Sequence, residues 1–544
     1  MHTSLQQSRA LLVLPACLVA AVVSLPIIVT LFSLAEPAGP IWEHLKTTVL
    51  SEYVVNSVAL MALTGGLSLV FGVSTGWLIG ACHFRGRATL SWLLMLPLAS
   101  PAYIVAYTYT DLLEVSGPIQ TALRSWLDLE ITDLQLPSIR NLTGAAFLLS
   151  LVLYPYIYLL CRNSFAGRSG AQFDAARVLG HGSYSAFFRV ALPAARPAIM
   201  GGLALVLMET LADFGVVSYF SVPTFSTGIF RTWLGLGDSQ AALRLASLML
   251  LFVIILIGLE EGSRRGAVDR SDVSGAAQIN LKGIKALLAI SACALPIVLG
   301  FVIPVVTLAL YAVDNLNVVT TSRFADLVIN SMSLAITAGI GITLVAWMLA
   351  YTKRLHPSRL NHSLIRLSTL GYALPGILLA VALLKPVGAF DNWLIQMGAT
   401  GSGALLSGSI FVLLYAYVCR FLTVAYQSVE SGFAGISTDI DAAARTLGAT
   451  TRDMIQNVHF PLLKPSIFAA CLLVFVDVMR ELPATLILRP FNFDTLATQV
   501  YRLAGDERLA EASSAALLIV MLGVLPVVLL QRSHSLRGDS DSRD

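Results

Sequence analysis

The chain has 544 residues, of which 56% are hydrophobic and only 12% are charged, and its mean hydropathy is +0.77. A water-soluble domain could not bury so much apolar surface, so this composition excludes a soluble globular protein. The net charge of +3 is too small to indicate a nucleic-acid partner, and the six cysteines lack the C-x-x-C spacing of a zinc site.

Apolar segments long enough to cross a membrane recur along the whole chain. About 20 apolar residues cross the bilayer core of ~30 Å. We count twelve such segments, at 11–34, 56–80, 88–110, 141–162, 199–221, 241–260, 286–312, 328–351, 363–387, 404–427, 466–488 and 512–531. The sequence therefore predicts an all-α polytopic membrane protein with about 12 transmembrane helices. The first segment is long for a signal peptide and no clear A-x-A site follows it, so we expect a retained span.

Lys and Arg alternate between the loops. Arg85 and Arg87 lie in one loop and Arg264 and Arg265 in another, whereas the intervening loops carry mainly acids. Because cytoplasmic loops are enriched in Lys and Arg, we expect both termini to be cytoplasmic.

The chain reads as a tandem duplication of a six-span unit. Asn56-Ser57 recurs as Asn330-Ser331, 274 positions further on, and Gly180 recurs as Gly448, 268 positions further on. The predicted organisation is a first half at 1–262, a cytoplasmic linker at 263–285, a second half at 286–531 and a polar, disordered cytoplasmic tail at 532–544. Six spans restore the orientation, so these are parallel repeats, with a pathway expected at their interface.

A polar loop between spans is repeated in both halves, at 174–199 (elbow one) and 442–467 (elbow two). In each, a short helix ends at a glycine and a second helix precedes a proline, which suits docking on a soluble partner; the alternative is a bend that only shapes the next span. We assign the docking on this partner, and hence the coupling between the partner and the spans, to the following residues: Asp174, Ala175, Ala176, Arg177, Gly180, Pro193, Ala442, Ala443, Ala444, Arg445, Gly448 and Pro461.

Acidic residues lie inside two equivalent spans. At the same 268-residue spacing, Glu209 aligns with Asp477 and Asp213 with Glu481, each pair being four residues apart and so expected on one helical face. Intramembrane acids usually face a cavity or a partner. We predict a translocation pathway at these four carboxylates and Arg480, with the carboxylates as transient ligands of a hard cation. The alternative is a structural network in which Arg480 neutralises Asp477. Phenolic oxygens of Tyr103, Tyr107, Tyr109 and Tyr219 could contribute to the pathway, although such tyrosines more often belong to an aromatic belt.

Two outer segments, 221–232 and 489–500, also match between the halves. Phe225 aligns with Phe493 and Thr227 with Thr495 at the same spacing of 268. The match extends the sequence repeat to the outer side of the membrane.

The two elbows resemble the EAA loop of ABC importer permeases, whose pattern is E-A-A-x3-G-x9-I-x-L-P. Elbow one has Asp174-Ala175-Ala176, Gly180 and Pro193; elbow two has Ala442-Ala443-Ala444, Gly448 and Pro461, with Asp441 one position early. With the outer segments, the chain resembles the fused two-half permease of bacterial ferric-iron importers of the type I fold. This resemblance implies that the segments 221–232 and 489–500 form a docking and gating surface, the alternative being ordinary re-entrant packing.

The resemblance implies a multi-pass subunit of the bacterial inner membrane, Fe³⁺ as cargo, a periplasmic ferric-iron-binding protein and two copies of a cytoplasmic ATPase that holds ATP and Mg²⁺. The chain itself lacks the G-x-x-x-x-G-K-[ST] phosphate loop, so we expect a transport subunit without cofactor rather than an enzyme. The alternatives are a permease for thiamine, polyamine or phosphonate, an ion-coupled secondary transporter, and a membrane scaffold or receptor.

Overall fold

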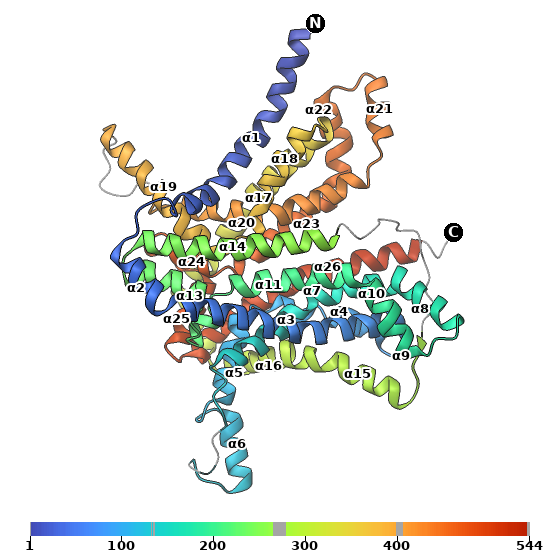
Figure 1. Cartoon of the computed structure of the whole chain (residues 1–544), viewed down its shortest axis with the longest axis vertical. Coiled ribbons are helices and arrows are strands. Elements are labelled where there is room, and N and C mark those ends of the chain that lie inside the picture. The colour runs from blue at the N-terminus through green and yellow to red at the C-terminus, as the bar shows by residue number, and fades with distance from the viewer. Residues whose placement is uncertain (1, 132, 134–135, 265–278, 399–405, 541–544) are drawn as a thin grey trace. The chain divides into compact units, whose positions relative to one another are not determined.

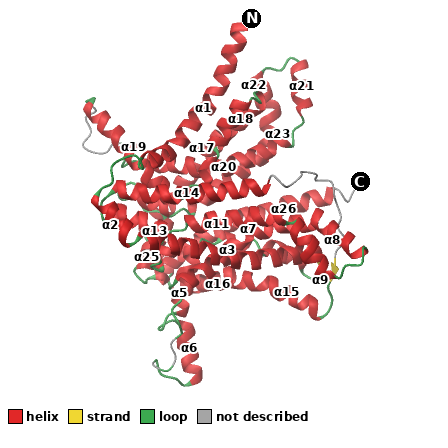
Figure 2. Cartoon of the chain, in the orientation of Figure 1, coloured by secondary structure: helices red, strands yellow, loops and turns green. Residues whose placement is uncertain are grey.

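The computed structural model describes the chain except residues 1, 132, 134–135, 265–278, 399–405 and 541–544, so most of the predicted linker lies outside the described residues. Most of the described residues are helical (Figure 2). Ten helices among them are long and apolar enough to cross a membrane, or up to twelve if each of two bent pairs is one span. The predicted all-α membrane architecture is therefore confirmed.

The helices pack as two units (Figure 1), which we name after the elbow each contains. The elbow-one unit comprises 40–231, 248–324 and 499–544, and the elbow-two unit comprises 1–39, 232–247 and 325–498. The elbow-one unit holds α2 (Pro40–Thr48), α3 (Leu50–Ala81), α4 (Arg87–Leu93), α5 (Ala102–Leu113), α6 (Pro118–Leu127), α7 (Leu142–Ala166), α8 (Arg168–Val178), α9 (Ser183–Ala186), α10 (Leu192–Ala194), α11 (Arg196–Ala212), α12 (Gly215–Tyr219), α13 (Phe225–Phe230), α15 (Ile284–Ile297), α16 (Ile303–Asp314) and α26 (Leu509–Ser540).

The elbow-two unit holds α1 (His2–Phe32), α17 (Ser322–Leu355), α18 (Arg359–Ser368), α19 (Gly376–Gln396), α20 (Ile410–Ala434), α21 (Thr438–Thr446), α22 (Thr451–Asp453), α23 (Phe460–Met479) and α24 (Pro483–Leu488). Two further helices, α14 (Ser239–Arg264) and α25 (Leu496–Gly505), contribute residues to both units, as does α17, whose residues 322–324 belong to the elbow-one unit.

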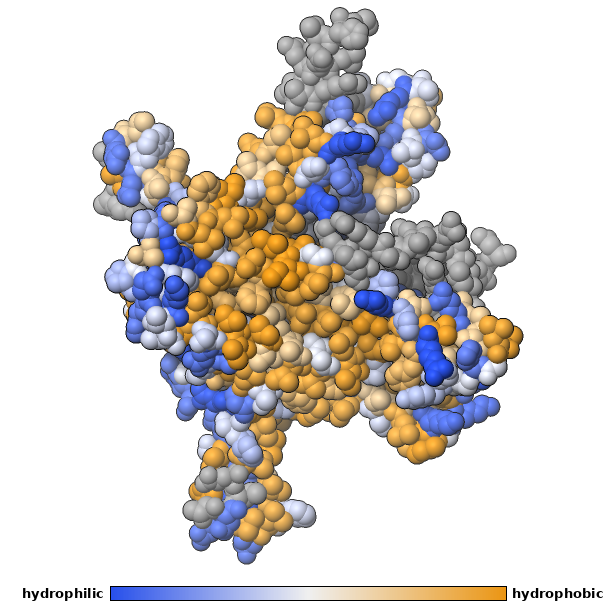
Figure 3. Space-filling view, viewed as in Figure 1, coloured by the Kyte–Doolittle hydropathy of each residue, from blue (hydrophilic) through white to orange (hydrophobic). Residues whose placement is uncertain are grey.

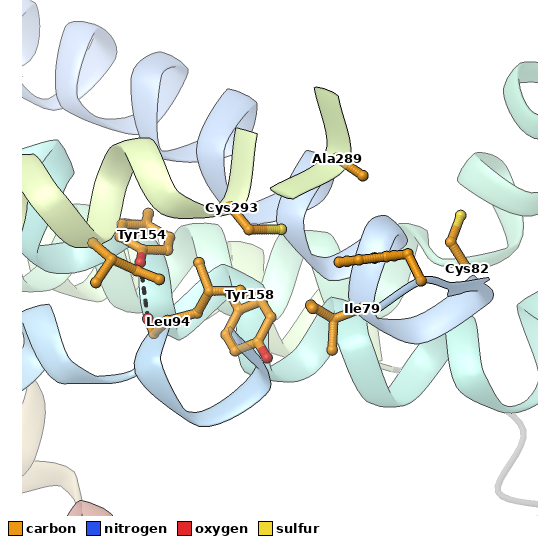
Figure 4. Packing of buried hydrophobic residues seen from close by; sticks show 9 residues of the cluster. Ile79, Cys82, Leu94, Tyr154, Tyr158, Ala289 and Cys293 are labelled. Carbon is orange, nitrogen blue, oxygen red and sulfur yellow. Dashed lines mark hydrogen bonds between the residues drawn. The ribbon is translucent and has the colours of Figure 1, made fainter. Parts of the chain in front are cut away.

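The packing units exchange outer helices relative to the two halves of the sequence. In the elbow-one unit, Ala289 and Cys293 of α15, from the second half, pack with Tyr154 and Tyr158 of α7 from the first (Figure 4). Two-residue strands β1 (Cys82–His83) and β2 (Ile279–Asn280) pair in parallel beside this cluster. In the elbow-two unit, α1 packs against α18, α19 and α20. The duplication at 1–262 and 286–531 is thus a relationship of sequence, and each compact unit takes helices from both halves.

Four predicted spans are broken rather than continuous, which corrects the sequence prediction for 88–110, 199–221, 363–387 and 466–488. The helices around 100 bend by 88°. The new helices α5 and α19 start directly after Pro101 and Pro375, whose extended backbone (ψ 134° and 138°) cannot continue a helix from the preceding turn. The other two breaks fall at Asp213 and at Arg480 to Leu482.

The surface of the long helices matches a lipid environment. On α14, the exposed apolar residues recur at helical spacing on one side (Leu251, Ile254, Ile255 and Leu259). In Figure 3 apolar side chains cover α14, whereas hydrophilic ones gather around α8 and around α21 and α22. The tail predicted to be disordered from Arg532 differs from this expectation, because α26 continues to Ser540.

Candidate coupling elbows and translocation site

Both elbows form the predicted helix–glycine–helix shape. In elbow one, α8 ends before Gly180, which has φ +93°, and the amide of His181 donates to the carbonyl of Ala176 at 3.1 Å. In elbow two, Gly448 has φ +81° and the amide of Ala449 donates to the carbonyl of Ala444 at 3.0 Å. This six-to-one bond with a left-handed residue is the Schellman helix end, which glycine adopts without a steric penalty. The second helix of each elbow includes a π-helical turn, at Phe187–Ala191 and at Met454–His459.

The assigned coupling residues lie mostly on the surface. Among them Ala176 is buried, Asp174 and Ala444 are half-buried, and the rest are exposed: Ala175, Arg177, Gly180, Pro193, Ala442, Ala443, Arg445, Gly448 and Pro461. Each proline lies two residues after the end of the π-helical turn, in an α-helical segment that continues directly from that turn.

Each elbow exposes a large apolar side chain beside its glycine. Leu179 is 81% exposed and Leu447, at the equivalent position, is 87% exposed. Elbow one adds Val178 and Tyr184, which are 88% and 78% exposed. Clustered exposed apolar side chains at the polar end of a membrane protein indicate a surface that another protein covers.

The predicted pathway residues of the elbow-one unit lie where α11 ends. Glu209 is half-buried in the last turn of α11, and Asp213 follows the helix with an extended backbone. The Asp213 carboxylate accepts from the amides of Val216 and Val217, both at 3.2 Å, and so caps α12. The expectation that both acids share one continuous helical face is corrected, because the helix has ended before Asp213.

The equivalent acids of the elbow-two unit are engaged with arginines. Glu481 is 5% exposed and accepts from the amides of Ala484 and Thr485, both at 3.0 Å, so it caps α24 in the manner of Asp213. It also forms an ion pair with Arg420 at 3.3 Å, and Asp477 forms one with Arg480 at 2.5 Å. The structural network that the sequence left open, with Arg480 beside Asp477, is therefore present.

Arg420 was missed by the sequence analysis. It stands alone in the predicted span 404–427, and a lone arginine inside an apolar span is itself a signal of a buried partner. Gly376 makes room for the pair, since a Cβ there would overlap both the Arg420 guanidinium and the Glu481 carboxylate. In the first half Val152 takes the equivalent position, so the two units differ in charge around their matched acids.

Three tyrosines gather near Asp213. The ring of Tyr107 meets those of Tyr219 at 4.4 Å and Tyr103 at 5.7 Å between centroids. Tyr501, which the sequence analysis did not name, shares a hydrogen bond of 2.9 Å with Ser218. Tyr109 is directed elsewhere and donates to the carbonyl of Leu299. Within the described residues, no three His, Cys, Asp or Glu side chains come close enough together to hold a metal ion.

The outer segments match between the units in a register different from the predicted one. The amide of Thr224 donates to Thr227 at 2.8 Å, and that of Thr495 donates to Thr498 at 2.9 Å. The next residue along each segment also donates its amide to an equivalent serine: Phe225 to the hydroxyl of Ser57 at 3.1 Å, and Leu496 to the hydroxyl of Ser331 at 2.8 Å. The structural spacing is therefore 271, and the predicted pairs Thr227–Thr495 and Phe225–Phe493 are wrong. The second loop is three residues longer, and its Phe491 is 94% exposed.

Comparison with known proteins places the chain among transport subunits. Residues 342–537, which include elbow two and its flanking spans, match the family model described as a binding-protein-dependent transport system inner membrane component. Over these residues the chain is similar to this permease family. The similarity supports a multi-pass inner-membrane transport subunit rather than an enzyme, with an ATPase and a periplasmic binding protein as its partners.

Relatives of known name extend the likeness over most of the chain. This permease is 23% identical over 490 residues to the Fe(3+)-transport system permease protein FbpB 2 of Haemophilus influenzae, covering 89% of this chain and 90% of the relative. It is 22% identical to the ferric transport system permease protein FbpB of Actinobacillus pleuropneumoniae, over 87% of this chain and 70% of that relative. The molybdenum transport system permease protein ModB of Escherichia coli is 26% identical, and 97% of its length corresponds to 43% of this chain. A whole ModB thus matches less than half of this permease.

Proposed function

We propose that this permease is the membrane subunit of an ATP-driven importer that moves ferric iron from a periplasmic binding protein to the cytoplasm. The observation that carries the cargo is the likeness to two permeases named for ferric transport, which spans both halves of the chain. ModB matches 43% of the chain, and so supports the transport class more than the cargo.

The matched elbows support two copies of the ATPase, one on each elbow. In both elbows the first helix ends at a left-handed glycine and exposes a leucine directly before it, so one kind of groove on the ATPase fits both elbows. The ATPase binds ATP and Mg²⁺. Both elbows and both termini lie on the cytoplasmic side of the membrane, in accord with the alternation of basic loops. Closure of the ATPases on ATP moves the elbows together, and the spans that follow them, α11 and α23, carry this motion into the membrane.

The cargo passes the broken spans by alternating access. Glu481 is paired with Arg420 and Asp477 with Arg480, so we assign a structural role to the elbow-two acids. We assign the cation contact mainly to Asp213, at the break between α11 and α12, together with Glu209 one turn before it. Carboxylate oxygens suit a hard trivalent ion, and a site with few ligands releases it readily.

The test is uptake of labelled ferric iron into proteoliposomes that hold this permease with its ATPase and the loaded binding protein, with and without ATP. ATP-dependent iron entry is expected. Stimulation of ATP hydrolysis by another loaded binding protein, with no iron entry, would keep the importer class and replace the cargo. Transport driven by an ion gradient without any ATPase would contradict the proposal as a whole.

A further inference from the structure

Elbow two is attached to its unit by charged side chains inside the protein. Arg354, near the end of α17, donates to both carboxylate oxygens of Asp441 in α21, from Nε at 2.9 Å and from Nη2 at 3.2 Å. His459, the last residue of the π-helical turn, places Nε2 3.0 Å from the same carboxylate. Asp441 is 6% exposed and His459 is 0% exposed. These three residues, which we call the anchor triad, thus join α17, the elbow helix and the start of α23.

The anchor triad also holds the first turn of the elbow helix. Arg354 Nη2 donates to the carbonyl of Ser437 at 3.0 Å, and Ser437 is the residue that caps α21. The His459 ring meets those of Tyr351 and Phe433 at 5.6 and 5.7 Å, which fixes its orientation. Its Nδ1 is buried without a hydrogen-bond partner, which fits a neutral imidazole that donates from Nε2 to Asp441.

Elbow one is attached by different chemistry at the equivalent positions. The spacing of 274 in the span and 268 in the elbow places Gly80, Phe173 and Ala191 opposite the anchor triad. Here the ring of Trp77 packs at 4.7 to 5.1 Å between centroids on three phenylalanines: Phe165, Phe173 and Phe187. The positions equivalent to the anchor triad therefore hold uncharged residues in elbow one, and Phe173 among them packs in an aromatic cluster.

These two kinds of attachment tolerate movement differently. Ring packing is a sum of many small contacts that decline gradually as groups slide. A bidentate arginine–carboxylate pair depends on geometry, and losing one partner leaves a buried charge unpaired. An elbow held by the anchor triad therefore moves as one body with α17 and the start of α23.

We propose that Arg354, Asp441 and His459 are positioning residues that make elbow two a rigid lever, so that ATPase movement at this elbow is transmitted to the spans through the ion pair. The inference rests on the proposed function of the elbows and adds that coupling at elbow two depends on the buried charges of the anchor triad, whose equivalent positions in elbow one hold Gly80, Phe173 and Ala191.

The test compares Asp441→Asn and His459→Leu with two matched variants in the assembled transporter. Asp439→Asn alters an exposed carboxylate on the same helix, and His459→Gln retains a side-chain N–H donor at the buried position. The measurements are cargo transported per ATP hydrolysed and hydrogen exchange of residues 437–459 against residues 170–191.

We expect Asp441→Asn and His459→Leu to lower the transport-to-hydrolysis ratio by about fivefold or more, and to raise exchange in elbow two alone. Asp439→Asn and His459→Gln should resemble the wild type. Unchanged exchange in both damaging variants would overturn the anchor whatever the cargo is, since that measurement involves no iron. Faster exchange with an unchanged ratio would overturn the role in coupling. Should Asp441→Asn fail to accumulate in the membrane, the His459 pair decides the question. Failure of the wild type to transport iron would overturn the proposed cargo alone.

Discussion

Asp213 and Glu481 do the same structural task in the two units: each carboxylate accepts the amides three and four residues further along the chain and so starts a short helix after a broken span. Their surroundings differ, because Glu481 also binds Arg420 and the hydroxyl of Thr485, at 2.6 Å, whereas Val152 stands where the first half would hold an arginine. Equivalent positions in a duplicated protein have thus diverged in charge while retaining the helix cap.

This divergence predicts opposite results for two conservative substitutions. Asp213→Asn retains a good helix cap, so the permease should fold normally while iron uptake falls about tenfold or more through the lost charge. Glu481→Gln strands Arg420 in a buried site and should lower the free energy of unfolding by about 3–5 kcal/mol. Thermal unfolding in detergent and iron uptake separate the two. Normal uptake by Asp213→Asn would remove this residue from the pathway.

The left-handed glycines give a second prediction. Gly180→Val and Gly448→Val force a branched residue into φ near +90°, at a cost of roughly 1–2 kcal/mol for the left-handed backbone alone, and should redirect the second helix of the elbow. We expect the ATPase to bind less well and uptake to fall. The matched control is Gly182→Ala in elbow one, where an added Cβ meets no atom within 4 Å and the backbone is not left-handed. Wild-type uptake in both valine variants would contradict a coupling role for the elbows.

The exposed leucines give a third prediction. Leu179→Asp and Leu447→Asp place a charge on the surface that the ATPase is expected to cover, so each should weaken ATPase binding by about tenfold or more without altering the fold. Elbow one also exposes Val178 and Tyr184, so it should retain more of its binding than elbow two does. Titration of the purified permease with the ATPase measures both affinities. Leu179→Met and Leu447→Met serve as controls, and aspartate variants that bind like them would place the ATPase elsewhere.

The anchor triad predicts how elbow two responds to pH. Burial raises the pKa of the Asp441 carboxyl, but the hydrogen bonds from Arg354 and His459 and the positive charge of Arg354 outweigh it, and the pKa lies below its ordinary value of 3.8. Because the pKa of Asp441 is lower in the folded elbow than in the unfolded chain, its ionised carboxylate stabilises the elbow fully at any pH above the ordinary pKa. This stabilisation is lost as the pH falls through the lowered pKa of the folded elbow. Hydrogen exchange in residues 437–459, corrected for intrinsic rates, should therefore stay constant from pH 8 to about 5. Loosening of elbow two between pH 8 and 6, with elbow one as the reference, would contradict this assignment.

The elbows were predictable because their geometry is local. A glycine that ends a helix acts through its own backbone and its neighbours, and both glycines end their helices at the predicted places, whereas the second helix of each elbow continues through the proline that was expected to follow it. The breaks in the spans at Pro101 and Pro375 could have been read from the same rule, because a proline interrupts the preceding helix.

The partners of the buried charges were not predictable in this way. Arg420 meets Glu481 from a span 61 positions away, and Arg354 meets Asp441 across 87 positions. Such pairs depend on how helices pack, and one sequence contains no measure of that distance. The predicted register of the outer segments was wrong for a related reason. The three-residue insertion around Phe491 leaves both flanking helices intact, and the hydrogen bonds of Ser57 and Ser331 in the folded protein reveal it.

The exchange of outer helices has a consequence for how the protein is made. Helix α26 is translated after all the other described helices, yet it packs in the unit whose first helices were inserted hundreds of residues earlier. Until α26 is inserted, that unit retains an incomplete face in the bilayer, and α1 likewise waits for helices not yet synthesised. Assembly of this permease therefore cannot proceed half by half, and neither half expressed alone would contain all the helices of either unit.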